Sequence, residues 1–220
     1  MKLTLAAATG ATGRLVLEQA LEAGHEVTAV VRSPGKLPAG VAAVQADLSR
    51  PDPDALAAAV AGADAVVSAL GPTAKAEAGV AETGTRALIA AMERAGTRRL
   101  VVLSAAPIGT VPTAARPDKP RHDPGDGPLL RLLTPIVKRA LAGHYADVAA
   151  MEDAVLDSGL DWTIVRPPRL TDKPAAGAWR TAYGRNPRNG FTIARADLAA
   201  AMLRSIGDPA AVRQVLGVAY

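Results

Sequence analysis

The fold is decided by a stretch near the amino terminus, KLTLAAATGATG at residues 2–13. Residues 2–7 predict a buried strand, because the apolar run is short and ends at a Thr-Gly-Ala-Thr-Gly turn. After the turn, apolar and polar side chains recur with helical spacing, and Gly24 is placed to end that helix. A strand, a glycine turn and a helix in this order are typical of the first unit of a parallel α/β sheet.

The same alternation continues along the chain. Further strands are predicted at 26–31, 41–46, 63–70, 99–105, 161–165 and 213–218, the last at a sheet edge, and further helices at 56–61, 80–95, 129–141, 145–158 and 196–206. We therefore predict an α/β fold of the Rossmann type, a doubly wound, mainly parallel sheet of about six to seven strands with helices on both faces. No internal repeat or linker is visible, so residues 1–220 are expected to form a single domain.

The composition argues against several functional classes. The 220 residues carry a formal net charge of +4, without a basic block, and include only two Trp, three Tyr and one Phe, so no nucleic-acid partner is expected. No leader-like amino terminus and no long uncharged apolar run is present, which predicts a cytoplasmic protein with no membrane partner. The chain has no cysteine, and acidic clusters such as Asp118, Asp123 and Asp126 lack metal-ligand spacing, so no metal is expected. The oligomeric state is left open.

A proline-rich segment interrupts the alternation at residues 107–128. Six prolines in 22 residues exclude a regular element there. A loop of this length is usually functional or disordered. Because it follows the end of a predicted strand, where ligands bind in doubly wound sheets, both a mobile lid and an unstructured surface insertion remain open.

The turn after the first strand predicts a dinucleotide site. A pyrophosphate needs a turn without bulky side chains, so that backbone N–H groups at a positive helix end can approach it. Gly10 would allow that approach, and Gly13 would allow the helix to pack closely on the strand. The hydroxyls of Thr9 and Thr12, on either side of Ala11, can add hydrogen-bond donors. A single glycine motif is weak evidence, but here it lies in the first strand–helix unit of an alternating chain.

The end of the second predicted strand favours NADP(H) over NAD(H). An NAD site places an acidic residue there for the ribose 2′-hydroxyl. This chain has Arg32, with Lys36 in the next turn. A guanidinium can bind a 2′-phosphate with two hydrogen bonds, whereas a carboxylate would repel it. The alternative is that Arg32 is an ordinary solvated arginine at a strand end.

Two further segments are expected in the same pocket. Asp47, next to Leu48, follows the third predicted strand and can accept a hydrogen bond from an adenine amino group, although it can also simply begin a turn. Ala69, Leu70 and Gly71 end the fourth predicted strand, where an uncrowded backbone can lie along the ribose and nicotinamide.

With these residues the chain resembles the atypical short-chain dehydrogenase/reductases, in particular the small NAD(P)H-binding proteins that include NmrA-like proteins and the flavin reductase or biliverdin IX-beta reductase type. The resemblance covers nearly the whole chain. It is carried by the Thr-Gly-Ala-Thr-Gly loop and by the stretches GHEVT at 24–28, VR at 31–32, DL at 47–48, AVVS at 65–68, SGLDWT at 158–163, RPP at 166–168 and RADLA at 195–199.

The resemblance also shows departures from the family. The first glycine of the family's phosphate loop falls on Ala7, which we expect to keep a negative φ. The larger family uses a Tyr-x-x-x-Lys pair, in which the lysine lowers the tyrosine pKa. In this chain Tyr145 is followed four residues later by Ala149, so the pair is absent and Tyr145 is expected to pack rather than to donate a proton.

For the reacting end of the site, the resemblance implies Ser104, Pro168 and Arg169 around the nicotinamide. Ser104 falls after the fifth predicted strand, and Arg169 stands where the flavin reductase type has a histidine. These two are our candidate catalytic residues. Each has a structural alternative: Ser104 can cap a backbone group, and Arg169 can pair with Asp172 or with solvent.

We therefore expect an NADP(H)-dependent oxidoreductase that transfers hydride to a flavin-like, quinone or other conjugated small-molecule acceptor. Such acceptors can take their proton from water, which fits a chain without the Tyr-x-x-x-Lys pair. One alternative is a non-catalytic NADP(H)-sensing protein of the NmrA-like type. A second alternative, a nucleotide-sugar epimerase or dehydratase, is disfavoured by the missing pair.

Overall fold

The protein, seen as a computed structural model, forms one eight-stranded sheet in the order β3-β2-β1-β4-β5-β6-β10-β8. The structure describes residues 1–71 and 79–220. The sheet strands are β1 Lys2–Ala6, β2 Glu26–Val31, β3 Ala42–Gln45, β4 Ala65–Ser68, β5 Arg99–Leu103, β6 Asp161–Arg166, β8 Arg180–Tyr183 and β10 Gln214–Ala219. All neighbours pair in parallel except β10 and β8. The predicted Rossmann-type fold is confirmed.

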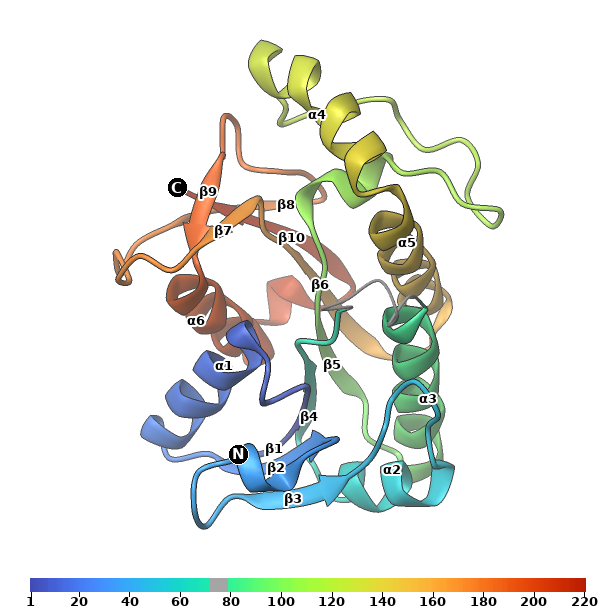
Figure 1. The fold of residues 1–220 in the computed structure, drawn as a ribbon, viewed down its shortest axis with the longest axis vertical. Helices are drawn as coiled ribbons and strands as arrows, with labels where there is room; N and C mark the ends of the chain where they lie inside the picture. Colours follow the sequence, from blue (N-terminus) through green and yellow to red (C-terminus); the bar gives the residue numbers. More distant parts are fainter. Residues whose placement is uncertain (72–78) are drawn as a thin grey trace.

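Helices cover both faces of this sheet (Figure 1). They are α1 Ala11–Glu22, α2 Pro53–Val60, α3 Val80–Ala95, α4 Pro128–Ala140, α5 Ala142–Asp157 and α6 Arg195–Ile206. Helices α1 and α6 pack on one face, and α2, α3 and α5 on the other. Alternate strand residues enter the two resulting cores, with Val66 in one and Val67 in the other. This explains why the strands are apolar on both sides.

The carboxyl-terminal part differs from the prediction. Strand β10 was expected at an edge, but it lies between β6 and β8, so the edge prediction is wrong. The short strands β7 Arg169–Thr171, β8 and β9 Thr192–Ala194 were not predicted, and β7 and β9 form a separate two-stranded sheet. Strands of three or four residues are hard to read from sequence unless, as at β3 and β4, they lie within a longer apolar run.

The proline-rich segment is packed against the body of the protein. It begins with a short 3-10 helix, Ala106–Thr110. Arg116 forms ion pairs with Asp153 and Asp157 of α5, at 3.1 and 2.5 Å. Further along, the Asp123 carboxylate accepts a hydrogen bond from the backbone N–H of Asn186 at 2.9 Å. An unstructured insertion is therefore wrong, because Arg116 holds the middle of the segment and Asp123 holds its later part.

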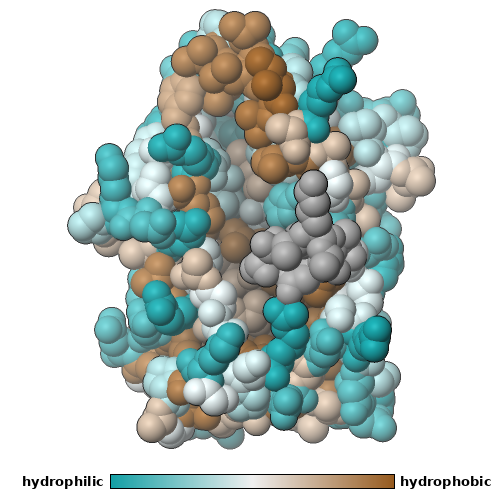
Figure 2. All heavy atoms as spheres, in the orientation of Figure 1, coloured by the Kyte–Doolittle hydropathy of each residue, from teal (hydrophilic) through white to brown (hydrophobic). Residues whose placement is uncertain are grey.

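Helix α4 projects from the body and exposes apolar side chains (Figure 1). Leu132 and Ile136 are 69% and 65% exposed. In Figure 2 apolar side chains gather at the top of the molecule over this helix, above a hollow in the same face. No helix in the described parts of the chain is both long and apolar enough to cross a membrane.

Candidate functional site

A cavity of about 610 Å³ opens at the carboxyl ends of β1, β2, β3 and β4. Ligands of doubly wound sheets bind at this edge. Eight predicted cofactor residues line it: Thr9, Gly10, Arg32, Lys36, Asp47, Leu48, Leu70 and Gly71. The remaining predicted cofactor residues, Ala11, Thr12, Gly13, Ala69, Ser104 and Pro168, are not part of the lining. The structure thus brings together four chain segments that were predicted to share one pocket.

The glycine turn packs tightly between β1 and α1. The backbone N–H of Gly10 donates to the Ala7 carbonyl at 3.0 Å. A Cβ at Gly13 would lie 2.1 Å from the same carbonyl oxygen, so no larger residue fits there. Gly13 therefore has the packing role that we predicted for it.

Ala7 adopts a left-handed backbone conformation with φ of +61°. We expected a negative φ, and that expectation is wrong. An L-residue in this region costs about 1–2 kcal/mol, because its Cβ approaches the following carbonyl. Ala7 therefore adopts a backbone conformation that favours glycine, at a cost in free energy.

The amino terminus of α1 faces the cavity. Gly10 is its N-cap, no side chain caps it, and no acidic residue lies in its first turn. The positive end of the helix dipole and the first N–H groups are thus left for an anion. Thr12 is buried within α1 and Ala11 is exposed, so of the two threonines only Thr9 lines the cavity.

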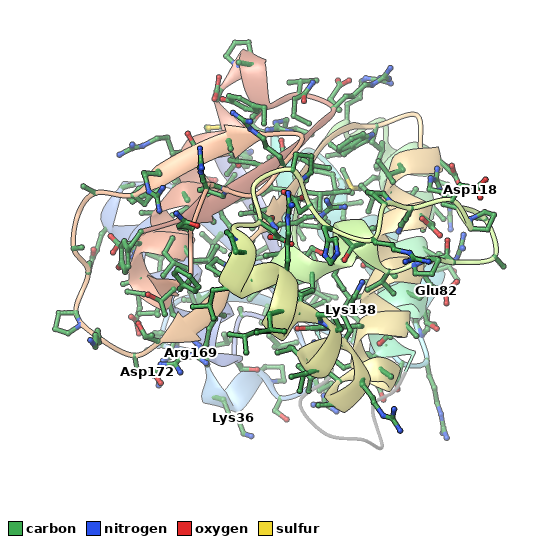
Figure 3. The ribbon with its side chains drawn as sticks, turned by 90° about the horizontal axis from the view of Figure 1, so that it is seen from above. Lys36, Glu82, Asp118, Lys138, Arg169 and Asp172 are labelled. Atoms are coloured by element: carbon green, nitrogen blue, oxygen red, sulfur yellow. The ribbon has the colours of Figure 1, made fainter. Side chains whose placement is uncertain are left out.

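Basic side chains form one wall. Arg32 follows the end of β2, and Lys36 lies in a short 3-10 helix, Pro34–Lys36. Both residues are exposed (Lys36 is labelled in Figure 3). The Arg32 carbonyl accepts a hydrogen bond from the Gln45 side chain at 3.2 Å, which ties the segment after β2 to β3.

Asp47 forms a turn of its own at the cavity. Its Oδ1 accepts hydrogen bonds from the Ser49 hydroxyl at 2.7 Å and the Ser49 N–H at 3.0 Å. These bonds, first the hydroxyl and then the N–H, hold the pKa of Asp47 below its ordinary value, and the positive charges of Arg32 and Arg50 act in the same direction. The carboxylate is therefore ionised at neutral pH and can act only as an acceptor.

Ser104 lies outside the lining of this cavity, in a buried polar cluster. Its hydroxyl donates to Glu152 Oε1 at 2.5 Å. The same carboxylate accepts from Arg166, through Nε at 2.8 Å and Nη2 at 2.5 Å. Glu152 is fully buried, and Ser104 and Arg166 are each 8% exposed. The catalytic role of Ser104 stays a prediction, since its hydroxyl is held by a carboxylate.

Glu152 was not among the predicted site residues. A signal was present, because Arg166 follows the apolar Ile164 and Val165 at the end of a buried strand, and a buried guanidinium requires a carboxylate partner. Nothing in the sequence pointed to Glu152 among the acidic residues as that partner.

Arg169 is exposed on β7, immediately after Pro168. The pairing with Asp172 that we considered is not observed, because the Asp172 carboxylate accepts from Arg195 instead. Figure 3 shows Arg169 and Asp172 on one side of the molecule, away from Glu82 and Asp118. The catalytic role of Arg169 also stays a prediction.

Tyr145 packs in the core near the start of α5. It is 7% exposed, and burial raises its pKa above the ordinary value. Two residues later, the Asp147 carboxylate accepts from the N–H groups of Ala81 and Glu82, at 3.1 and 2.9 Å. Asp147 thereby caps α3 from a neighbouring helix. Asp147, near the start of α5, therefore has a structural role.

Metal ligands do not gather in the part of the chain that the structure describes. Among residues 1–71 and 79–220 no group of three or more His, Asp or Glu side chains is arranged to hold an ion.

Comparison with known proteins agrees with this geometry. A family model described as NAD(P)H-binding matches residues 7–209. A solved protein from Burkholderia pseudomallei is 32% identical, with each chain covered to 100% and a TM-score of 0.72. The anaerobillin reductase ChuY from Escherichia coli O157:H7 is 24% identical, with 100% of this chain and 97% of that chain covered and a TM-score of 0.77. A short-chain dehydrogenase/reductase from Veillonella parvula, solved in complex with NADP, is 16% identical, with 100% and 94% covered and a TM-score of 0.77.

Proposed function

Because the chain belongs to the NAD(P)H-binding family, we propose that it is an NADP(H)-dependent reductase that transfers hydride to a flavin-like or other conjugated small molecule. The observation that carries the cofactor preference is the joint placement of Gly10, Arg32 and Lys36 in one cavity. The similar proteins support this proposal: one was solved in complex with NADP, and another is named as an anaerobillin reductase.

The residues present fit a dinucleotide phosphate. The uncapped amino terminus of α1 would hold the pyrophosphate, with Thr9 adding a hydroxyl donor. Arg32 and Lys36 would bind the 2′-phosphate, and Asp47 would accept from the adenine amino group. A cavity of about 610 Å³ is within the usual range for small-molecule sites.

When bound, NADPH supplies a hydride, so that NADPH, a proton and the oxidised acceptor give NADP⁺ and the reduced acceptor. The chain's own part is to bind and orient both reactants. Because Tyr145 is buried and Ala149 follows where lysine would stand, no tyrosine–lysine pair delivers the proton. An acceptor that takes its proton from water suits this site better than a secondary alcohol or ketone.

The same missing pair favours one second candidate, a protein that senses NADP(H) without turnover. In that case cofactor occupancy would change a surface read by a partner. The two candidates make the same cofactor contacts and differ only in whether the bound cofactor is oxidised.

The test is a titration of the purified protein with NADPH and NADH, followed by NADPH oxidation with FMN, riboflavin and a naphthoquinone. Tighter binding of NADPH together with turnover is the expected result. Tight binding without turnover by any acceptor would favour the sensor. Binding of neither cofactor would overturn both candidates.

A further inference from the structure

A second cavity, of about 540 Å³, is rich in arginine. It lies between the start of α4, strand β8 and the loop that follows β8. Four of its lining residues, Arg131, Arg180, Arg185 and Arg188, define what we call the arginine pocket. Asp126 is the single acidic residue in the lining, so the pocket carries a clear positive excess.

The protein itself leaves most of this charge uncompensated. Arg131, Arg185 and Arg188 donate no side-chain hydrogen bond and form no ion pair with any residue that the structure describes. Arg180 donates to the Arg188 carbonyl at 2.6 Å and to an oxygen of Tyr220. All four arginines are exposed, so water screens part of the repulsion between them, and a bound anion would offset the remainder.

The walls of the arginine pocket are held together before any ligand binds. Asp123 Oδ1 accepts from the N–H of Gly125 at 2.8 Å and from the N–H of Asn186 at 2.9 Å, which joins the two loops. A Cβ at Gly125 would lie 2.0 Å from the Asn186 carbonyl oxygen, so the loops touch closely. Asp123 is 4% exposed and Asn186 is 7% exposed. A preformed site loses less entropy on binding than a loop that must be ordered.

The start of α4 adds to the positive potential. Gly127, its N-cap, and Pro128 line the pocket, and no side chain caps the helix. The helix has 13 residues and contains no acidic residue in its first turn. Its positive dipole end therefore acts with the four arginines on the same space.

The sheet order places the arginine pocket beyond the reacting end of the proposed cofactor site. Arg180 pairs with Ala219 at the carboxyl end of β10, which is the edge that also holds the cofactor cavity. Strands β5, β6 and β10 lie between β4 and β8, a span of four strand spacings or about 19 Å, and β6 is two spacings or about 10 Å from β8. An acceptor bound over β5 and β6 would reach the pocket with a charged side arm.

We propose that the arginine pocket binds the anionic groups, phosphate or carboxylate, of the acceptor that the enzyme reduces. The proposal rests on the proposed function, because it assigns a substrate class to that site. It predicts an acceptor with a conjugated ring at one end and at least one phosphate or carboxylate on an arm of about 10 Å or less.

FMN and riboflavin test this directly, since they share one ring system and differ by a phosphate. Flavin fluorescence gives both dissociation constants at equilibrium, with NADP⁺ saturating and no turnover needed. We expect the wild type to bind FMN about tenfold more tightly than riboflavin. The double variant Arg185→Gln/Arg188→Gln should lose this preference and bind riboflavin unchanged. Arg139→Gln, an exposed arginine of α4 outside the pocket lining, is the matched control and should keep it.

A second measurement covers the case in which neither flavin binds. With NADP⁺ saturating, pyrophosphate and citrate should each raise the unfolding temperature of the wild type but not of the double variant. A response to one of the two anions identifies phosphate or carboxylate as the group that is bound.

The proposal would be overturned if the wild type and the double variant had the same ratio of FMN to riboflavin dissociation constants. It would also be overturned if anions shifted the unfolding temperatures of the two proteins equally. Failure of the proposed function is a separate outcome. It would appear as absent NADPH binding or absent NADPH oxidation. Neither the ratio of flavin dissociation constants nor the anion-induced change in unfolding temperature reports NADPH oxidation.

Discussion

Glu152 accepts two hydrogen bonds from the guanidinium of Arg166, and both side chains are buried. The pair connects α5 to the end of β6, and the Ser104 hydroxyl adds a third bond from the end of β5. Removing one charge of a buried ion pair destabilises a protein far more than replacing both charged residues with apolar ones, because a single charge remains buried without a partner. The three residues therefore act as one unit that sets the spacing of two strands and a helix.

We predict that Glu152→Gln lowers the free energy of unfolding by about 3 kcal/mol, because the Arg166 charge would remain buried without a counter-charge. Denaturant unfolding measures this loss. The double variant Glu152→Met/Arg166→Met, which removes both charges, should be more stable than Glu152→Gln. A double variant that is less stable would show that the pair is favourable in itself.

Ala7→Gly is predicted to stabilise the protein by about 0.5–1 kcal/mol. Glycine removes the left-handed strain at φ of +61°, and the gain exceeds its larger entropy in the unfolded chain. Thermal or denaturant unfolding provides the comparison. The neighbouring variant Ala8→Gly, at a buried position outside the left-handed region, should destabilise instead. The same sign for both variants would contradict the strain assigned to Ala7.

Arg32→Glu should weaken NADPH binding at least about tenfold and change NADH binding by less than about threefold. The substitution removes a partner of the 2′-phosphate and introduces a repelling charge. Isothermal titration with both cofactors measures the difference. Arg139→Glu, which changes the net charge equally but lies on α4, should leave both affinities unchanged. An equal loss for NADPH and NADH would remove Arg32 from the 2′-phosphate site.

Tyr145→Phe should leave NADPH oxidation within about twofold of the wild type, whereas loss of a general acid typically costs about a hundredfold or more. Burial raises the pKa of Tyr145 above the ordinary tyrosine value of 10.0. The hydroxyl therefore stays protonated at neutral and mildly alkaline pH. Turnover between about pH 6 and 9 should therefore show no titration from this residue. A large loss of turnover with unchanged unfolding would make Tyr145 a proton donor after all.

The sequence predicted the parts of the site that depend on short stretches of chain. Gly10, Arg32 and Asp47 each follow a strongly apolar strand, and parallel strands bring their carboxyl ends to one edge. That reasoning needs only the order of strands and helices. The observed sheet confirms the predicted fold, and the family match confirms the resemblance to NAD(P)H-binding proteins.

Features made by distant segments could not be predicted in the same way. The arginine pocket joins residues 124–131 to residues 180–188, and only the folded structure shows that Asp123 bridges them. Strand β10 was misplaced at the edge because its partner β8 is too short to be recognised. The positive φ of Ala7 opposes the preference of an alanine, and the close approach of Gly13 to the Ala7 carbonyl is visible only in the folded structure.

The position of β10 in the sheet determines how long one edge of β6 stays unpaired while the chain is synthesised. Strands β1 to β6 are synthesised first, and β6 remains an open edge until its neighbour β10 emerges, roughly 50 residues later. At typical rates of elongation this takes about 2–10 s. During that interval an apolar strand is available to pair with another nascent chain. We therefore expect the yield of native protein to respond to translation speed over residues 167–213.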